Sequence, residues 1–261
     1  MTEQEYRAAE GVNKSTLWEL RKSPAHYKYL LEHPTEDTQA LRFGRALHAA
    51  LLTPTAFKRD YVAAPAFDRR TKAGKAAYEE WRQGLGEGVT IMDAEELGTI
   101  KQMVKAYKAT PEARALLRKS RREVPLFWRD REVGLPCKCR VDAITPETII
   151  DVKTTMDGTT DAFRRDAMRY GYHVQAAHYL NGVETLTGRQ PEWYFLIMEK
   201  KAPYGVHLLK ASESFIELGA FERTRLLEQL KECMDTDTWP SYQTGELDPP
   251  EWAMYTGTGE V

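Results

Sequence analysis

The chain has 261 residues, of which 42% are hydrophobic and 29% are charged, a composition typical of a globular protein rather than of a disordered or fibrous one. Its formal net charge of −2 excludes a polycation that coats nucleic acid by bulk charge alone. No apolar run approaches the ~18 residues of a membrane span, and the three cysteines (Cys137, Cys139 and Cys233) fit neither a disulfide framework nor a zinc ribbon, so we expect a soluble, cytoplasmic protein.

The first 120 residues are predicted to be mostly helical. Asn13 can cap a helix over residues 14–21, and a second short helix follows over residues 24–31. Apolar residues recur at helical spacing over residues 38–52, a stretch that carries His48. Three more helices are expected: an exposed one that follows a basic loop and reaches residue 81, then residues 93–109 and 112–119.

From residue 122 onward the hydrophobic period changes to two residues, which is typical of strands. Three strands, over residues 123–128, 135–144 and 148–154, are predicted to form a β-meander. A long helix over residues 161–186, ending at Gly188, follows the meander. The last predicted elements are strands over residues 192–198 and 206–210 and a helix from Ser212 or Ser214 to about residue 234.

Together these elements predict an α/β fold with a mixed central sheet flanked by helices. Because no long linker divides the chain, we expect a single domain over residues 1–261. Within it, residues 1–120 would form a mostly helical wall that carries His48, residues 121–235 the αβ core, and residues 236–261 an irregular tail.

The hairpin around Pro146 carries the sharpest chemical signal. A four-residue turn with Pro146 at its second position sets a register in which Asp142 faces Asp151. Such partners have Cβ atoms only ~4.5–5.5 Å apart, and like charges placed there repel. The same register puts Lys153 on this face, opposite Arg140. The other face is apolar and is expected to pack into the core through Val141, Ala143, Ile150 and Val152.

Two facing aspartates need a compensating charge. Asp151 lies inside an apolar strand, where an unpaired charge costs several kcal/mol. A divalent cation, for which carboxylate oxygens are natural ligands, would remove the repulsion. Lys153 could then orient water or stabilise charge that develops on a phosphate. The alternative is a solvated face or a shifted register, since a single D-x-K pattern is a weak signal.

Several motifs, in order along the chain, resemble the RecB-like branch of the PD-(D/E)xK nuclease superfamily. Asp142, followed after eight residues by Asp151, Val152 and Lys153, resembles the D…(D/E)-x-K core. Residues 43–48 (FGRALH) resemble the histidine motif of that branch, and residues 175–179 (QAAHY) its Q-x-x-x-Y motif. With residues 23–27 and 239–242 included, the chain most resembles the RecE-type exonucleases (exonuclease VIII family) over nearly its whole length. No proline precedes Asp142, where the superfamily label has one.

The resemblance implies a nuclease fold of this type and a set of site residues. His48, Asp142 and Asp151 would bind the metal, with the carbonyl of Val152 as a further ligand; Mg²⁺ is expected, and Mn²⁺ should substitute. The catalytic set would comprise Lys153, Asp142, Asp151, Glu123, Gln175 and Tyr179. The alternatives, for each residue taken singly, are a helix-surface or core histidine for His48, a solvated strand-end charge for Glu123 and a packing residue for Tyr179. Three cysteines cannot supply the four ligands of the iron–sulfur cluster found in some RecB-like nucleases, so no cluster is expected.

Basic residues are the candidates for DNA contact. A run of like charges is usually a solvated face, but several clusters in a chain of slight negative charge suggest a segregated phosphate-binding surface. The first helix start could also bind a terminal phosphate. The candidates are Arg69, Arg70 and Lys72, then Arg164 and Arg165, and then Lys14 with Ser15.

By resemblance, the expected function is that of a Mg²⁺-dependent exonuclease on double-stranded DNA. It would digest in the 5′-to-3′ direction and leave 3′ single-stranded overhangs for recombination by single-strand annealing. The implied partners are duplex DNA, further copies in a ring-shaped homo-oligomer, and a RecT-like annealing protein, in a bacterial host with a phage or prophage origin. One alternative is a RecB-like nuclease that acts on single-stranded ends or as an endonuclease. Another is a non-catalytic DNA-binding module.

Overall fold

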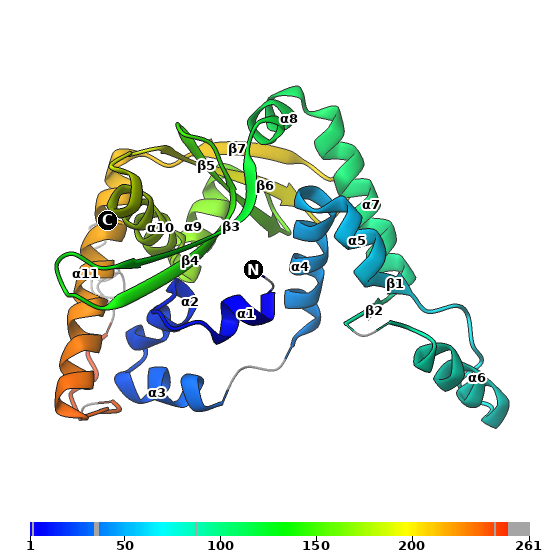
Figure 1. Cartoon of the computed structure of the whole chain (residues 1–261), viewed down its shortest axis with the longest axis horizontal. Helices are drawn as coiled ribbons and strands as arrows, with labels where there is room; N and C mark the ends of the chain where they lie inside the picture. Colours follow the sequence, from blue (N-terminus) through cyan, green and yellow to red (C-terminus); the bar gives the residue numbers. More distant parts are fainter. Residues whose placement is uncertain (2, 34–36, 87, 243, 250–261) are drawn as a thin grey trace, which may run out of the picture.

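The computed structural model describes residues 1, 3–33, 37–86, 88–242 and 244–249 (Figure 1). Its centre is a five-stranded mixed sheet in the order β3-β4-β5-β6-β7. The first three strands form the predicted antiparallel meander, β6 runs parallel to β5, and β7 runs antiparallel to β6. The strands are β3 (Arg121–Arg129), β4 (Pro136–Ile144), β5 (Thr148–Thr155), β6 (Glu192–Glu199) and β7 (Val206–Lys210).

The register of the hairpin agrees with the prediction, but the apolar residues of the hairpin do not all pack in the cluster expected for them. Ala143 pairs with Ile150 and Ile144 with Ile149, as the turn at Pro146 requires. Ala143 and Ile150 pack together in one buried cluster, whereas Val141 belongs to the other. Of the four residues expected to share one apolar face, Ala143, Ile150 and Val152 do so, and Val141 is the exception. Val141 and Ala143 lie on either side of Asp142, where the β4–β5 ladder stops and the Val152 N–H donates to the Asp142 side chain instead.

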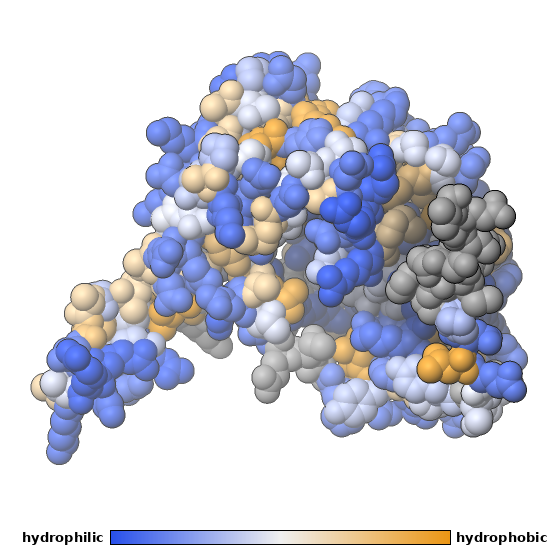
Figure 2. Space-filling view, turned by 180° about the vertical axis from the view of Figure 1, so that it is seen from behind, coloured by the Kyte–Doolittle hydropathy of each residue, from blue (hydrophilic) through white to orange (hydrophobic). Residues whose placement is uncertain are grey.

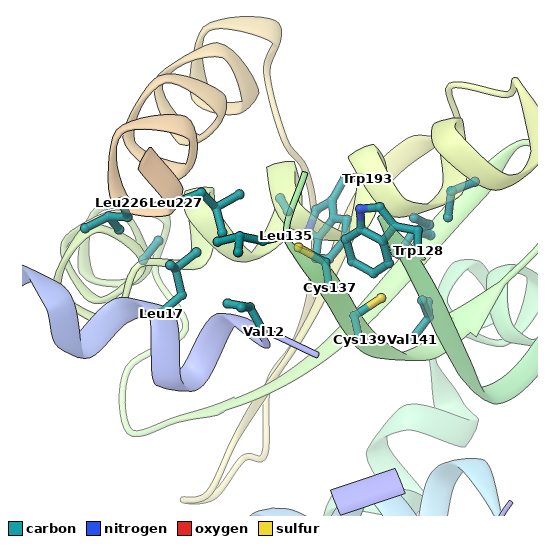
Figure 3. Close-up of a cluster of buried hydrophobic side chains, with 14 of the residues drawn as sticks. Val12, Leu17, Trp128, Leu135, Cys137, Cys139, Val141, Trp193, Leu226 and Leu227 are labelled. Carbon is teal, nitrogen blue, oxygen red and sulfur yellow. The ribbon is translucent and has the colours of Figure 1, made fainter. Parts of the chain in front are cut away.

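Helices cover both faces of the sheet and bury two apolar clusters. Figure 3 shows the first cluster, which includes Cys137 and Cys139 from β4 together with Leu17 and Leu227. All three cysteines are buried and free, and burial raises the pKa of the Cys137 thiol to about 11, so the thiol is unreactive near neutral pH. The second cluster lies on the side of α4 (Gln39–Leu52) and α7 (Ala94–Ala109).

The N-terminal half is helical, as predicted, with three additions. A helix is present before Asn13, Pro54 begins a new helix rather than only ending one, and a short parallel strand pair is inserted. Proline is well suited to the first turn of a helix because its missing N–H has no partner there in any case. The further elements of this half are α1 (Glu3–Ala8), α2 (Lys14–Leu17) with the 3₁₀ turn η1 (Trp18–Arg21), α3 (Pro24–Glu32), α5 (Pro54–Asp60), β1 (Tyr61–Ala63), α6 (Lys72–Gln83), β2 (Thr90–Met92) and α8 (Pro111–Arg118).

The long helix predicted over residues 161–186 is in fact two helices, α9 (Thr160–Tyr170) and α10 (Tyr172–Thr187). Gly171 separates them with a φ of +66°, a left-handed conformation that ends α9. A Cβ at Gly171 would lie 2.6 Å from the Trp18 ring, so glycine also permits a close approach. The expectation failed because α9 and α10 are joined without a polar loop between them. The final helix, α11 (Glu213–Thr236), begins after its N-cap Ser212 as expected.

One helix stands apart from the rest. Figures 1 and 2 show α6 at the end of an arm that projects from the body. No residue of α6 is buried, although every residue of this helix is described. The rings of Phe67, Tyr78 and Trp81 pack on one another along the arm, with centroid separations of 5.8–5.9 Å.

Two further observations concern the ends of the chain and membranes. After α11, the described residues form no further helix or strand, and Trp239 stacks on Tyr27 with ring centroids 6.0 Å apart. Part of the predicted tail, residues 243 and 250–261, lies outside the described residues. Within the described part of the chain, no helix is both long enough and apolar enough to cross a membrane.

Candidate active site

The two aspartates of the hairpin lie where β4 and β5 separate. The ladder between these strands reaches Ala143 and Ile150 but is not continued beside Asp142. The backbone N–H of Val152 instead donates to Asp142 Oδ2 over 2.8 Å. A side-chain carboxylate thus accepts the hydrogen bond that a regular ladder would give to a backbone carbonyl, and the sheet opens at this point.

The helix α4 brings His48 to the opening. His48 Nε2 donates to the carbonyl oxygen of Val152 over 3.0 Å, and Nδ1 lies 3.4 Å from Asp142 Oδ1. Burial by itself lowers the pKa of His48, but the Asp142 carboxylate more than reverses this and raises the pKa to about 9. Burial likewise opposes ionisation of Asp142, yet the imidazolium of His48 keeps the pKa of that carboxyl below its usual value. In the metal-free protein the two residues therefore form an ion pair.

Asp151, Lys153 and Gln175 form a closed set of contacts on the other side of the opening. Lys153 Nζ lies 2.5 Å from Asp151 Oδ2 and donates to Gln175 Oε1 over 3.1 Å. Gln175 Nε2 donates to Asp151 Oδ1 over 2.6 Å. Burial raises the pKa of Asp151 despite the neighbouring ammonium. Burial alone lowers the pKa of Lys153, but Asp151 raises it above its ordinary value, so the lysine stays charged near neutral pH.

Glu123 completes the site from β3, in a strained conformation. Its φ is +51°, which is costly for a residue with a Cβ, by about 1–3 kcal/mol. Its Oε2 lies 2.9 Å from Arg140 Nε. Backbone strain of this kind clusters at functional sites, because the surrounding structure must hold it in place.

The donor atoms suit a divalent cation. Among the described residues, one ligand atom each of His48, Glu123 and Asp142 lie within 4.8 Å of one another. Asp151, also predicted as a ligand, is not in this group, and its buried Oδ2 instead faces Lys153 Nζ at 2.5 Å. Carboxylates with an imidazole match the ligand preferences of Mg²⁺ and Mn²⁺. The set differs from the sequence-based one in that Glu123 joins it, while the Val152 carbonyl accepts a hydrogen bond from His48.

The two tyrosines of α10 lie in different surroundings. Tyr179 packs in the first core cluster, where its ring meets Trp193 edge-on at 5.7 Å, and burial raises its pKa well above the ordinary value. The residue beside the lysine is Tyr172, whose ring centroid lies 4.5 Å from Lys153 Nζ. Sequence reasoning missed Tyr172, although it lies three residues before Gln175 and so shares its side of the helix.

Of the predicted DNA-contact residues, Lys14 lies closest to the site. Its Nζ donates to the carbonyl oxygen of Tyr170 and lies 5.2 Å from the Trp18 ring centroid and 5.9 Å from that of Tyr172. Burial, followed by the charge of Lys153, lowers the pKa of Lys14 to about 7. Ser15 is exposed at the start of the same short helix.

The remaining basic candidates fall on two surfaces. Arg69 lies 4.4 Å from the Tyr78 ring centroid and Arg70 pairs with Asp68 at 3.0 Å, both on the arm, where Lys72 begins α6. The other surface belongs to α9, from which Arg164 pairs with Asp161 at 2.9 Å and Arg165 is exposed. The structure thus places one group on the projecting arm and another on the helix that leads to Tyr172.

Comparison with known proteins gives a family and a fold. The model of a family described as "PDDEXK-like domain of unknown function (DUF3799)" matches residues 13–248. A solved structure described as "Putative exonuclease" from Eubacterium rectale superposes with a TM-score of 0.63 over 98% of both chains, at 11% identity. A phage related exonuclease from Haemophilus somnus 129PT has a TM-score of 0.33 at 14% identity, over 64% of this chain and 84% of that one. No curated protein matches the chain.

Proposed function

The chain belongs to the family of PDDEXK-like domains of unknown function DUF3799, and from that membership we propose that it is a divalent-metal-dependent nuclease that hydrolyses DNA phosphodiester bonds. One observation carries the proposal. Possible ligand atoms of His48, Glu123 and Asp142 converge within 4.8 Å, directly beside a lysine that Asp151 and Gln175 hold in place. A binding module has no need for this concentration of buried charge, which costs free energy to assemble.

The residues of the site divide into ligands and an electrostatic group. His48, Glu123 and Asp142 would hold the cation, and Asp151, whose Oδ2 is paired with Lys153 at 2.5 Å, would add a carboxylate beside it. When bound, a divalent cation polarises the phosphoryl oxygen and lowers the pKa of water to make a nucleophile. Because an imidazole binds a cation only when neutral, His48 must give up a proton on loading.

Lys153 is the group that acts on the phosphate. Its ammonium, kept charged by Asp151, stabilises the negative charge that grows on the non-bridging oxygens as the phosphorus is attacked. The hydrogen bond to Gln175 and the ring of Tyr172 restrict its position. An ammonium that is already oriented needs little reorganisation in the transition state, and this is the source of its effect on rate.

We propose further that the substrate is duplex DNA digested from an end, in the 5′-to-3′ direction, leaving 3′ overhangs for a RecT-like annealing partner. Support comes from the motif resemblance to RecE-type exonucleases and from the similar fold of a chain described as an exonuclease. Mg²⁺ is the expected cation, with Mn²⁺ as a substitute. Lys14 and Arg165 near the site, and Arg69, Arg70 and Lys72 on the arm, would contact phosphates in a ring of subunits.

The test is digestion of a linear duplex labelled at the 5′ or the 3′ end, with Mg²⁺, with Mn²⁺ and with EDTA. We expect metal-dependent loss of the 5′ label first and the appearance of 3′ single strands. The Asp142→Asn variant should retain the fold by circular dichroism and lose cleavage. Cleavage of closed circles at the rate of linear duplex would favour an endonuclease. DNA binding without cleavage under either metal would favour the non-catalytic module.

A further inference from the structure

A hollow of about 420 Å³ opens next to the site, at the carboxyl end of the parallel pair β5 and β6. Ligands commonly bind outside the carboxyl ends of parallel strands, where the connecting segments diverge. The volume of the hollow lies within the range of ~300–1,000 Å³ that is typical of small-ligand sites. The wall is formed by the end of β5 and the loop after it, by α9, by the first residue of α10 and by the residue after β6. Among its members are Thr154, Met156 and Asp157, then Arg165, Asp166 and Tyr170, then Tyr172 and Lys200.

The hollow and the active site share a wall. Tyr172 lines the hollow, and its ring centroid lies 4.5 Å from Lys153 Nζ. Thr154, which also lines the hollow, directly follows Lys153 in β5. A group bound in the hollow would therefore be the next unit of a chain whose phosphate lies at Lys153.

The lining offers a flat aromatic surface. Tyr170 is 46% exposed, and its ring stacks beside that of Tyr172, with centroids 5.9 Å apart and planes at 29°. Met156, 55% exposed, adds an apolar contact at the same opening. Exposed aromatic faces beside a phosphate-binding site are the usual means of holding an unpaired base, since every base has a π-face.

The charges of the lining favour a nucleotide over an inorganic anion. Two cations, Arg165 and Lys200, are balanced by two carboxylates, Asp157 and Asp166. Such a rim gives little net attraction for a free phosphate. These charges suit a nucleotide: its phosphate can pair with the two cations, and hydrogen-bond donors on the edge of its base can bind the two carboxylates.

We propose that this hollow binds the nucleotide that adjoins the scissile phosphate on the cleaved strand, with its base unpaired and stacked on Tyr170 and its own phosphate facing Arg165 and Lys200. The inference rests on the proposed nuclease function. It adds to it a specific contact, namely a base stacked on Tyr170 beside the scissile phosphate.

The test scans a single abasic residue along a 5′-phosphorylated oligonucleotide that carries a 3′ fluorescein. Binding is measured by anisotropy with Ca²⁺, a hard cation with the same oxygen-ligand preference. Cleavage is measured with Mg²⁺ and Mn²⁺ in single turnovers, and product length locates the scissile phosphate. The variants are Tyr170→Ala, Tyr170→Phe and, as a control on a remote and 63% exposed tyrosine, Tyr29→Ala.

We expect Tyr170→Ala to weaken binding about 5- to 100-fold, the range for loss of one stacked base, while Tyr170→Phe and Tyr29→Ala bind as the wild type does. In the wild type, an abasic residue should weaken binding by the same factor, and only when it replaces the nucleotide beside the scissile phosphate. In Tyr170→Ala, an abasic residue at that position should weaken binding no further. If the abasic residue weakens binding to Tyr170→Ala as much as it weakens binding to the wild type, the inference is wrong. If the wild type cleaves no DNA with either metal, the proposed nuclease function is wrong. The abasic scan of binding then still shows whether the hollow holds a base.

Discussion

Every carboxylate of the site faces a cationic side chain at short range in the metal-free protein. Buried charges are tolerated only when paired, and breaking such a pair costs about 3–5 kcal/mol. The site can therefore fold before it binds metal, and loading must displace or rearrange these contacts. The pairs are Asp142 with His48 at 3.4 Å, Asp151 with Lys153 at 2.5 Å, and Glu123 with Arg140 at 2.9 Å.

The first prediction concerns Lys153. Lys153→Ala should lower the single-turnover cleavage rate by at least ~10², because its ammonium acts on developing charge. It should also destabilise the metal-free protein by about 3–5 kcal/mol in urea unfolding, since Asp151 is left buried without its partner. The double variant Lys153→Ala/Asp151→Asn should recover most of the stability and none of the activity. Wild-type turnover in Lys153→Ala would show that the lysine has no catalytic role.

The second prediction separates strain from ligation at Glu123. Glu123→Gly and Glu123→Ala both remove the carboxylate, so both should weaken Mn²⁺ binding to the same extent in calorimetric titration. At a φ of +51°, however, glycine is unstrained and alanine is not. We expect the glycine variant to be about 1 kcal/mol more stable than the alanine variant. Equal stabilities would mean that this backbone conformation is not retained in solution.

At the scale of elements, α4 carries the partly buried His48 and α10 the fully buried His178, and the two respond to pH in opposite directions. On α10, burial, followed by the charge of Arg223, lowers the pKa of His178 to about 3, and its Nδ1 accepts from Arg223 Nε over 3.2 Å. On α4, the pKa of His48 is raised to about 9. In the unfolded chain both titrate near ~6.5.

The third prediction follows from the signs of these shifts. Below pH ~6.5 the unfolded chain protonates His178 but the folded protein does not, so stability falls with decreasing pH. Above pH ~6.5 the folded protein keeps the His48 proton that the unfolded chain loses, so stability falls as pH rises toward 9. Above pH ~7 Lys14, whose pKa is lowered to about 7, contributes the opposite slope, because the unfolded chain keeps a proton that the folded protein loses. In a Lys14→Met background, which removes this contribution, metal-free protein should be most stable near pH 6.5, with limbs of at most ~1.4 kcal/mol per pH unit. Urea unfolding from pH 5 to 8.5 measures this.

Single variants show which histidine causes the fall in stability on each side of the maximum. His178→Gln should flatten the acid limb and His48→Gln the alkaline one, while each leaves the other limb in place. A stability curve without a maximum between pH 5 and 8.5, or limbs that both persist in both variants, would contradict the assignment.

The fourth prediction concerns the junction of α9 and α10. Gly171→Ala places a Cβ 2.6 Å from the Trp18 ring and so must shift the start of α10, which carries Tyr172 and Gln175. Gly188→Ala is a matched control, because Gly188 has a similar φ of +70° but open space around it. The control should lose about 1 kcal/mol from the left-handed backbone alone. Gly171→Ala should lose clearly more and should also lower the cleavage rate. Equal losses in the two variants would show that the contact with Trp18 is unimportant.

At the scale of the whole molecule, the projecting arm and the near-neutral charge bear on how the protein stays on DNA. A net charge of −2 provides little long-range attraction for a polyanion, so persistence must come from dense local phosphate contacts or from enclosure by several subunits. An arm whose helix has no buried residue is suited to reach beyond the body of the protein.

The fifth prediction is that digestion of duplex DNA is end-dependent and processive. Dense phosphate contacts would make persistence fall steeply with salt, by about 0.9 in log K per log unit of salt for each contact. Enclosure would confine the salt effect mainly to loading. Excess unlabelled duplex, added after loading at moderate salt, should therefore leave shortening of the loaded chains unchanged. Immediate arrest on challenge would argue against a closed ring.

Local patterns in the sequence determined most of the elements and the pairing of the hairpin. These patterns act over only a few residues, so they can be predicted from the sequence without the fold. They are helix caps such as Asn13 and Ser212, the two-residue period of the meander and the turn at Pro146. These patterns predicted that Asp142 and Asp151 lie on neighbouring strands beside Lys153.

Only the tertiary structure decided which side chains meet at that opening. His48 reaches Asp142 because α4 packs against the sheet, and Glu123 joins them through a strained backbone that no periodicity reveals. Tyr172, rather than Tyr179, meets Lys153 because the bend at Gly171 sets how α10 crosses the sheet. Such contacts depend on how separate elements pack, and packing is governed by long-range burial that a local pattern does not contain.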